Sequence, residues 1–510
     1  MLAKVQTATL TGLTAVLVTV EVDVSDGLPG VTIVGLPDAT VKESKERIRS
    51  AIKNTQYAWP QTRVTVSLAP ADVRKEGAAF DLPIALGLLA ASKQLDPDCF
   101  ADKVILGELA LDGSLRPVPG VLAVAMALKK TGKTLLLPSG NGAEAAMVGA
   151  GPVFPLLHLH QAAAFLKGEE VLEPLRTEES AWVRPGSPEG LDFSEVKGQR
   201  VAKRAIEVAV AGGHNLLLLG PPGAGKTMLA QRIPTVIPEM SKEEARETTL
   251  VYSAMGLLSP QKPLVMTRPF RAPHHSISDA GLIGGGTVPR PGEISLAHHG
   301  VLYLDELPEF NRGVLETLRQ PLEEGQVTVA RVQGTMTFPA RVMLIASMNP
   351  CPCGAAGDPG KSCLCNPGQI QRYRSKVSGP LLDRIDLHLE VPAVPLPELT
   401  GDGSSEQSSA IRARVEAARV LQKERFKEEK GIFCNAQMRH RHLKQFCGLT
   451  APGKELIRQA VQTLGLSARA YDRILKVART IADLAGSEAI EPEHLAEAIQ
   501  YRALDRSTWM

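Results

Sequence analysis

The stretch GPPGAGKT, at residues 220–227, carries the glycines, lysine and threonine from which phosphate-binding loops are built. It fits the pattern G-x-x-x-x-G-K-[ST] at every fixed position, between an apolar strand-like run and a helical run. Glycines let backbone N–H groups surround phosphate oxygens, Lys226 can reach the β- and γ-phosphates, and Thr227 can hold Mg²⁺. A glycine-rich surface turn is the alternative. We predict that ATP and Mg²⁺ bind here, through Gly220, Pro221, Pro222, Gly223, Ala224, Gly225, Lys226 and Thr227.

Polar residues end two further apolar runs. HGVLYLDE finishes in Asp305 and Glu306, and ARVMLIASMN finishes in Asn349. A carboxylate at a strand tip beside a phosphate loop can hold Mg²⁺, and a second carboxylate can polarise the attacking water as a general base. We assign these roles to Asp305 and Glu306, and expect the amide of Asn349 to orient the water. Solvated strand ends are the alternative.

An arginine precedes another apolar strand in GPLLDRIDLHLEV, where Arg384 stands between acidic residues. From this position a cation could act on the nucleotide of a neighbouring subunit, as an arginine finger supplied in trans. Membership in a surface ion pair is the alternative for Arg384.

Four of the seven cysteines, Cys351, Cys353, Cys363 and Cys365, lie in one loop rich in Gly, Ala and Pro that cannot build a core of its own. They form two Cys-x-Cys pairs, and four thiolates so spaced can close a tetrahedron around Zn²⁺. A metal would supply the folding energy that a core normally gives. We predict structural zinc; reversible thiol oxidation and four unrelated cysteines are the alternatives.

The length, charge and composition of the whole chain limit the classes of protein to which these motifs can belong. It has 510 residues, a net charge of +2 and 44% hydrophobic residues, which is ordinary for a globular protein of about three domains. Nucleic-acid binding would therefore need a local basic patch. The N-terminus lacks a secretory pattern, and the apolar run at 82–91 is far shorter than the roughly 20 residues of a membrane helix. We expect a cytoplasmic protein with no membrane partner, where clustered cysteines indicate metal or redox chemistry.

Composition predicts an α/β chain in three parts. Residues 1–167 mix alternating and helical runs, and residues 168–191 read as a linker rich in Glu, Pro, Ser and Gly. In residues 192–398, fully apolar strands alternate with helices, as in a parallel sheet buried on both faces. Residues 399–510 have helical periodicity. The middle part must position the phosphate loop, both carboxylates and the cysteines.

The motifs at 220–227, 304–306, Asn349 and Arg384 together resemble the AAA+ ATPases. RPFRAPHHSISDAGLIGGG, PGEISLAHHGVLYLDELPEF and SGPLLDRIDLHLEVP resemble the magnesium-chelatase-like branch and, within it, the YifB/ComM family. The resemblance covers essentially the whole chain. It implies a P-loop AAA+ core with a helical lid, a homo-hexameric ring with sites between subunits, and a sensing arginine in the lid that Arg469 matches. Taken alone, Arg469 could equally be a helix-surface charge.

The first domain resembles the S5-like proteolytic domain of Lon, through RKEGAAFDLPIALGLLAAS and GELALDGSLRPVPGVLAVAMAL. That enzyme uses a Ser–Lys dyad, because a nucleophile needs an adjacent base. Here the serine position falls on or beside Ala79 and the lysine position falls near Leu122. Neither residue has reactive chemistry, so we expect a scaffold or docking module.

Two segments could touch a substrate in the channel of a ring. Residues 268–293 contain Arg271, and residues 327–340 predict a hairpin around Gln333-Gly334 with Arg331 near its tip. Both arginines are candidate contacts to a DNA backbone, although Arg271 could instead brace a subunit interface. The family resemblance implies a branch-migration helicase acting on single-stranded or branched DNA in homologous recombination and natural transformation. A metal-insertion motor and a protein remodeller are the alternatives.

Overall fold

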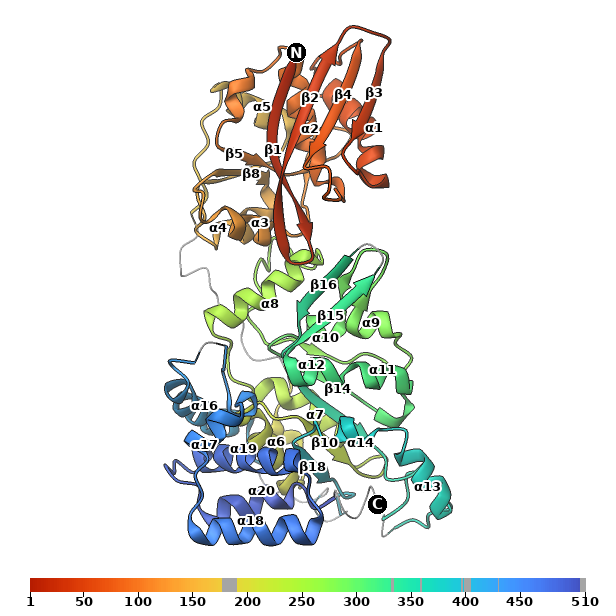
Figure 1. Ribbon diagram of the computed structural model, residues 1–510, viewed down its shortest axis with the longest axis vertical. Helices are drawn as coiled ribbons and strands as arrows, with labels where there is room; N and C mark the ends of the chain where they lie inside the picture. Colours follow the sequence, from red (N-terminus) through yellow and green to blue (C-terminus); the bar gives the residue numbers. More distant parts are fainter. Residues whose placement is uncertain are drawn as a thin grey trace. The chain divides into compact units, whose positions relative to one another are not determined.

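A computed structural model describes residues 1–176, 190–331, 334–357, 360–395, 398, 405–429 and 431–504 (Figure 1). By its internal contacts the chain divides into two compact units. The first unit combines Met1–Val183 with Lys242–Val265, and the second combines Arg184–Ser241 with Met266–Met510.

The first unit is built on a seven-stranded mixed sheet in the order β3-β4-β2-β1-β5-β8-β9. The β1–β2 and β2–β4 pairs are antiparallel, and the remaining pairs are parallel. Helix α2 packs on β1 and β2 and is buried at every position, which explains its continuous apolar sequence (Figure 1). The elements of this unit are β1 (Leu2–Thr11), β2 (Thr14–Ser25), β3 (Gly30–Val34), α1 (Ala39–Asn54), β4 (Arg63–Ala69), α2 (Asp81–Ala91), β5 (Lys103–Ile105), β6 (Glu108–Leu109), β7 (Leu115–Arg116), α3 (Val121–Leu128), β8 (Thr134–Pro138), α4 (Gly142–Ala146), β9 (Val153–Leu156), α5 (Leu159–Lys167) and α8 (Lys242–Ala254).

Helix α8 joins this unit although the sequence analysis placed it with the ATPase core at 192–398. It packs on α3, and the carbonyl of Ser253 accepts a hydrogen bond of 2.8 Å from the backbone N–H of Gly120. The Ser253 hydroxyl donates to the buried carboxylate of Glu144. Helical periodicity shows that a segment is a helix, but not which core it joins. The contacts of Ser253 therefore show that α8 belongs to the first unit, which the local sequence pattern could not show.

The second unit contains a five-stranded parallel sheet in the order β11-β14-β17-β10-β18. Strands β10, β14 and β17 are buried at every residue, as the apolar runs predict. The elements around this sheet are α6 (Arg200–Gly212), β10 (Leu216–Leu219), α7 (Lys226–Val236), β11 (Phe270–Arg271), α9 (Asp279–Ile283), β12 (Gly284–Gly285), β13 (Arg290–Pro291), α10 (Glu293–Leu296), β14 (Val301–Leu304), α11 (Arg312–Thr317), α12 (Arg319–Glu324), β15 (Gln326–Arg331), β16 (Gly334–Pro339), β17 (Met343–Met348), α13 (Pro367–Arg374), α14 (Gly379–Leu382) and β18 (Leu387–Glu390).

The C-terminal helices share one hydrophobic core with the parallel sheet. Ile474 and Leu495 from the helices belong to the same buried cluster as Leu216 and Ile345 from the strands. The helical lid is thus part of the second unit (Figure 1). Its helices are α16 (Ser408–Arg425), α17 (His440–Phe446), α18 (Ala451–Leu464), α19 (Ala468–Leu484) and α20 (Pro492–Gln500).

A buried polar network ties the lid to the sheet. The Asp386 carboxylate accepts a 2.9 Å hydrogen bond from the backbone N–H of Asn215 and pairs with Arg473 of α19. The amide of Asn215 donates to the carbonyl of Arg384 at 2.8 Å and accepts from the N–H of Leu344 at 2.8 Å. Asn215 therefore links the N-terminal ends of β10, β17 and β18. Asp386 connects these strand ends to the lid.

The boundaries expected between the domains fall partly outside the described residues. Residues 177–189, which are most of the linker expected at 168–191, lie outside the described residues. The junction at 399–404 lies outside them as well. In the part of the chain that the structure describes, no helix combines the length and the apolar character needed to cross a bilayer.

Candidate functional site

Three parallel strands deliver the candidate catalytic residues to one edge of the sheet. Strand β10 leads into the phosphate loop, β14 into Asp305 and Glu306, and β17 into Asn349. Carboxyl ends of neighbouring parallel strands meet at the same edge, where open α/β sheets commonly bind ligands. In the loop itself, Gly223 and Gly225 have φ values of +83° and +88°, which favour glycine.

The Lys226 ammonium lies across its own loop. It donates to the carbonyls of Gly220 at 2.6 Å and Pro221 at 3.0 Å, and to the side-chain oxygen of Asn349 at 3.1 Å. Burial lowers the pKa of Lys226, although the nearby carboxylates of Asp305 and Glu306 oppose this effect. The structure thus brings Lys226 and Asn349 together.

The Asp305 carboxylate meets the phosphate loop through Thr227. The Thr227 hydroxyl donates to one carboxylate oxygen at 2.9 Å, and the Ser347 hydroxyl donates to the other. Burial by itself would raise the pKa of Asp305, but hydrogen bonds from Ser347 and Thr227 outweigh it and lower the pKa. Asp305 is therefore charged at neutral pH, and its oxygens with the threonine hydroxyl have the ligand chemistry that Mg²⁺ prefers.

Glu306 differs from Asp305 in exposure and backbone conformation. Its side chain is 57% exposed, and its φ of +54° is in the left-handed region, which is uncommon for a residue other than glycine. Such backbone strain is often found at functional sites. The carboxylate lies 3.8 Å from a ring nitrogen of His275 and is open to solvent, as a general base acting on water requires.

Two polar residues that were not predicted from the sequence lie behind Asp305. Tyr303 and Ser347 lie inside buried strands, and the Tyr303 hydroxyl is 3.4 Å from the hydroxyls of both Thr227 and Ser347. Burial raises the pKa of Tyr303 to about 12, so this hydroxyl stays protonated. Each residue precedes a site residue by two positions, which places both side chains on one face of the strand. The alternation of side chains along a strand was therefore the sequence signal that could have identified Tyr303 and Ser347.

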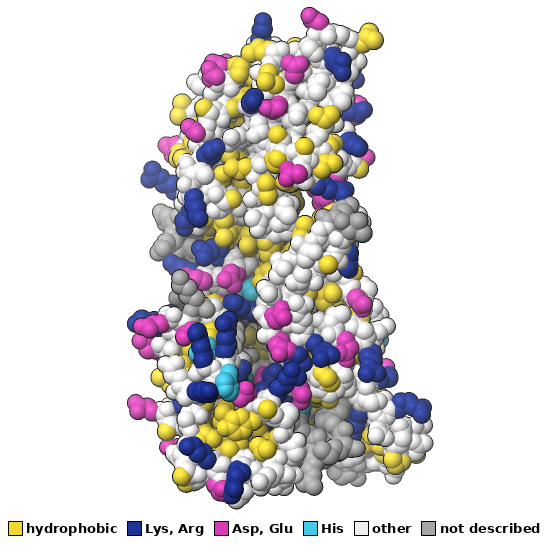
Figure 2. Space-filling view, in the orientation of Figure 1, with side chains coloured by type: hydrophobic (Ala, Val, Ile, Leu, Met, Phe, Trp, Pro, Cys, Tyr) yellow, Lys and Arg dark blue, Asp and Glu magenta, His cyan; other side chains and the backbone are white. Residues whose placement is uncertain are grey.

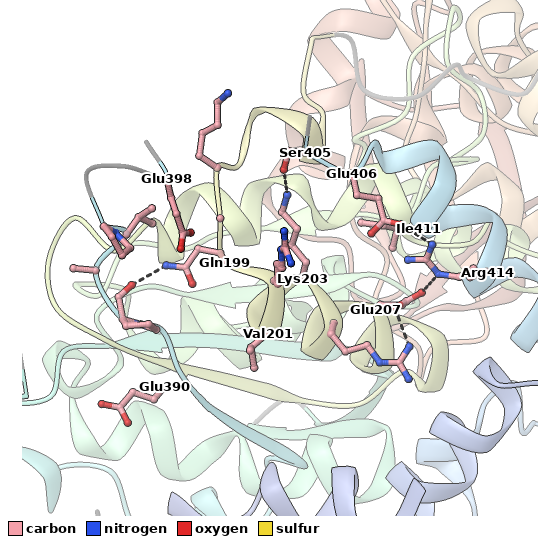
Figure 3. A pocket seen from close by; sticks show the side chains of 18 residues that line it. Gln199, Val201, Lys203, Glu207, Glu390, Glu398, Ser405, Glu406, Ile411 and Arg414 are labelled. Carbon is pink, nitrogen blue, oxygen red and sulfur yellow. Dashed lines mark hydrogen bonds and ion pairs between the residues drawn. The ribbon is translucent and has the colours of Figure 1, made fainter. Parts of the chain in front are cut away.

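A large pocket lies beside the start of α6 (Figure 3). It has a volume of about 1510 Å³ and is lined by residues near the start of α6, after β18 and near the start of α16. The Gln199 amide donates to the carbonyls of Pro392 at 2.7 Å and of Ala224 in the phosphate loop at 3.2 Å. The pocket therefore has room for the non-phosphate part of a nucleotide beside the loop.

Arg384 is held inside its own chain. Its guanidinium donates to the carbonyls of Arg319 at 3.0 Å and Pro380 at 2.7 Å, pairs with Glu323, and has only 8% of its side chain exposed. These contacts differ from the arginine finger expected from the sequence, because such a group must be offered to a neighbour. A single sequence cannot show that Glu323, on α12, would lie beside Arg384.

We expect the Arg384→Ala variant to lose about 1–3 kcal/mol of unfolding free energy, because two carbonyls and Glu323 lose a charged donor. Urea denaturation measures this loss. If Arg384 instead acts in trans, the variant should keep wild-type stability, and mixing it with Lys226→Ala should restore ATP turnover.

Arg469 lies in the first turn of α19 and is exposed. Arg473 of the same helix contacts the entrance of β18 instead, through Asp386. The geometry therefore leaves Arg469 available for a ligand at the surface, while Arg473 has a structural partner.

The two arginines expected to meet DNA differ in their surroundings. Arg271 makes a bidentate ion pair with Glu293, at 2.6 and 2.7 Å, so its guanidinium is already engaged. Arg331 ends β15 as predicted, is exposed, and lies against Gly285 of β12. Gln333 of the expected hairpin tip lies outside the described residues.

A further exposed arginine, Arg290, pairs with Gly285 across the β12–β13 ladder. Arg290 and Arg331 therefore flank the same glycine from two hairpins, and neither guanidinium has an ion pair with a described residue. Figure 2 shows Lys and Arg interspersed with Asp and Glu over the visible face, in keeping with a net charge of +2. A pair of arginines such as this would supply the local basic patch that nucleic-acid binding needs.

The four loop cysteines converge. The sulfur of Cys351 lies 3.4 Å from that of Cys353 and 3.7 Å from that of Cys363, and the Cys353 and Cys363 sulfurs are 3.6 Å apart. With Cys365 included, all four sulfurs lie within 4.8 Å of one another. Backbone hydrogen bonds from Ala355 and Leu364 lower the pKa of Cys353 to about 6. The cluster has the donor set of a Cys₄ metal site.

Three family models match consecutive parts of the chain. The model described as magnesium chelatase, subunit ChlI, matches residues 192–399, a second for subunit ChlI of Mg-chelatase matches residues 20–141, and one for the ChlI C-terminal part matches residues 405–502. The matched ranges include the phosphate loop, both carboxylates and the cysteine cluster.

Curated relatives match over nearly the full length. Competence protein ComM of Haemophilus influenzae is 47% identical over 99% of this chain and 98% of its own length. The uncharacterized protein YifB of Salmonella typhimurium is 45% identical over the same shares of both chains. Lon protease 2 of Bacillus subtilis is 28% identical over 30% of this chain and 28% of its own length.

Proposed function

The chain belongs to the YifB/ComM family of magnesium-chelatase-like AAA+ ATPases, and on this basis we propose that it is an ATP-driven DNA motor. In this proposal a homo-hexameric ring acts as a branch-migration helicase in homologous recombination and natural transformation. The competence role printed for the Haemophilus relative supports the biological setting. The observation that carries the ATPase part is the meeting of Thr227 with Asp305 and of Lys226 with Asn349 at one sheet edge.

Each residue has a task in ATP hydrolysis under this proposal. Lys226 and the backbone of the phosphate loop bind the phosphates, and Thr227 with Asp305 would hold Mg²⁺, which neutralises phosphate charge when bound. Glu306 accepts a proton from the attacking water, while Asn349 orients that water. ATP and Mg²⁺ are the cofactors, and the cysteine cluster is the candidate site for a structural Zn²⁺.

Arg290 and Arg331 would contact single-stranded or branched DNA through its phosphates. Both are exposed and lie at the Gly285 position shared by two hairpins. Arginines placed this way track a backbone without reading its sequence. Arg271 has the weaker case for this role, because Glu293 already binds its guanidinium.

A magnesium-chelatase-type motor for metal insertion is the second candidate, since the matching family models carry that description. ATP turnover stimulated by DNA separates it from the proposed function. Rates measured with single-stranded, duplex and branched DNA should exceed the rate without DNA. Equal rates under all four conditions would contradict the DNA motor.

We expect the Arg290→Ala/Arg331→Ala variant to keep its basal ATPase rate and to lose most of the stimulation by DNA. Each phosphate contact releases counterions on binding, so the slope of log affinity against log salt should become shallower by about one for each arginine removed. Fluorescence anisotropy with a labelled oligonucleotide at several salt concentrations measures the slope.

The matched control is Arg458→Ala, which removes an exposed arginine from α18 that pairs with Glu455. This variant should keep the wild-type slope and stimulation. An unchanged slope in the double variant would remove Arg290 and Arg331 from the DNA contact.

A further inference from the structure

We infer that a structural Zn²⁺ bound by Cys351, Cys353, Cys363 and Cys365 braces the phosphate loop, so that nucleotide affinity depends on this metal. The inference rests on nucleotide binding at the phosphate loop and adds a second metal site to it. It follows from the geometry of the sulfurs and from the contacts of the cysteine loop with the nucleotide site.

The sulfur geometry suits zinc. Zn–S bonds of about 2.3 Å in a tetrahedron place the sulfurs about 3.8 Å apart. The observed separations of 3.4, 3.6 and 3.7 Å approach this value, and all four cysteines are free thiols. The remaining cysteines, Cys99, Cys434 and Cys447, are also free and lie outside the cluster. Among the seven cysteines, clustering of the sulfurs is therefore confined to the four in this loop.

Both ends of the cysteine loop are tied at the nucleotide site. The loop leaves β17 through Asn349, whose side chain contacts Lys226 at 3.1 Å. It returns through α13. Arg374 of the same helix donates to the carbonyl of Pro350 at 3.1 Å. A force that opens the loop would therefore act on Asn349.

The middle of the loop lies against the phosphate loop. Gly354 adopts a φ of +79°, and a Cβ atom added there would lie 2.5 Å from Cδ of Pro222. Real Cβ atoms do not approach other atoms so closely, so the contact between Gly354 and Pro222 leaves no space for a methyl group. Gly354 stands between Cys353 and the buried Ala355, and its position depends on the cluster.

A tetrahedral metal ion such as Zn²⁺ can hold this arrangement through four thiolates. Within the described part of the loop, 351–357 and 360–365, the buried side chains are those of Cys351 and Ala355, which is too little apolar surface for a core. Four metal–thiolate bonds would replace that core. Without them, Pro222 and Asn349 lose their support, and a displacement of about 1 Å in a nucleotide site can cost on the order of 10²-fold in function.

The first measurement is metal content. Protein without a polyhistidine tag, purified without chelators, should contain about one zinc per chain by elemental analysis. The Cys353→Ser/Cys363→Ser variant should contain almost none, while the control Cys99→Ser should keep the wild-type content. A wild-type protein with no zinc and four titratable thiols would overturn the inference.

The second measurement tests the contact between Gly354 and Pro222 separately from metal binding. It remains informative even if the cysteine variant does not fold. Gly354→Ala and Gly357→Ala both put alanine at a positive φ, of +79° and +78°. Among the described residues, the new Cβ at Gly357 meets only Glu390, at 3.8 Å. Both variants should keep their zinc, but Gly354→Ala alone should bind a fluorescent ATP analogue about tenfold or more weakly. Equal affinities of the two variants for the analogue would contradict the proposal that the cysteine loop supports the phosphate loop.

The wild-type affinity distinguishes this inference from the ATPase proposal. If the wild-type protein binds no ATP analogue, the nucleotide site itself is contradicted. If it binds the analogue and the glycine variants do not differ, the failure lies with the brace alone.

Discussion

Replacing Glu306 by Gln should leave ATP binding intact and slow hydrolysis by about 10²–10⁴-fold, the usual contribution of a general base. The structure explains why binding should survive. The Glu306 side chain is 57% exposed, while Lys226, Thr227 and Asp305 form their own contacts beside it. The amide of Gln keeps the size of the side chain but cannot accept the proton of water. Single-turnover hydrolysis and equilibrium binding of an ATP analogue measure the two effects separately.

Two variants bracket this result. Glu309→Gln changes an exposed carboxylate in the following turn, which pairs with Lys376 at 3.5 Å, and should hydrolyse ATP at the wild-type rate. Lys226→Ala removes the ammonium that lies across the phosphate loop and should weaken binding itself. A Glu306→Gln variant with wild-type turnover would show that another residue is the base.

Replacing Asp386 by Ala should lower the unfolding free energy by about 3–5 kcal/mol, the range for removing one partner of a buried ion pair. Asp386 is 3% exposed, and its loss leaves Arg473 and the backbone N–H of Asn215 without their acceptor. Burial lowers the pKa of His214, so Arg473 is the charged partner at neutral pH. Urea denaturation at pH 7 measures the change.

The effect should also depend on pH. Burial alone would raise the pKa of Asp386, but Arg473 and His214 hold it well below its ordinary value of 3.8. A carboxylate with a depressed pKa stabilises the folded state above its ordinary pKa, and this stabilisation is lost as the pH falls below it. The difference between wild type and Asp386→Ala should therefore shrink below about pH 4. Asp383→Ala, at a half-buried neighbour, should show neither the large loss nor this shrinkage.

The parallel sheet and the nucleotide site were predictable because their signals are local. Fully apolar runs identify strands buried on both faces, and the residue after each run then lies at a known edge of the sheet. At this edge Asp305 lies beside Thr227, and Asn349 lies beside Lys226. Alternation along β14 and β17 would also have shown Tyr303 and Ser347, had their positions been compared with those of Asp305 and Asn349.

Partners that come from distant segments were not predictable. The burial of Arg384 depends on Glu323, and the ion pair of Arg271 depends on Glu293, both on other helices. A charged residue next to acidic residues reads as a surface group until its three-dimensional neighbours are known. The membership of α8 in the first unit has the same origin, since its contact with Glu144 joins residues that are 109 positions apart in the sequence.

The placement of α8 means that no single cut in the gene separates the two units. The chain passes between them near residues 183, 241 and 265. A fragment that ended at residue 176 would lack Ser253, and the buried carboxylate of Glu144 would lose the hydroxyl that binds it. The first unit is therefore completed by Lys242–Val265, a segment encoded within the range that matches the magnesium chelatase model.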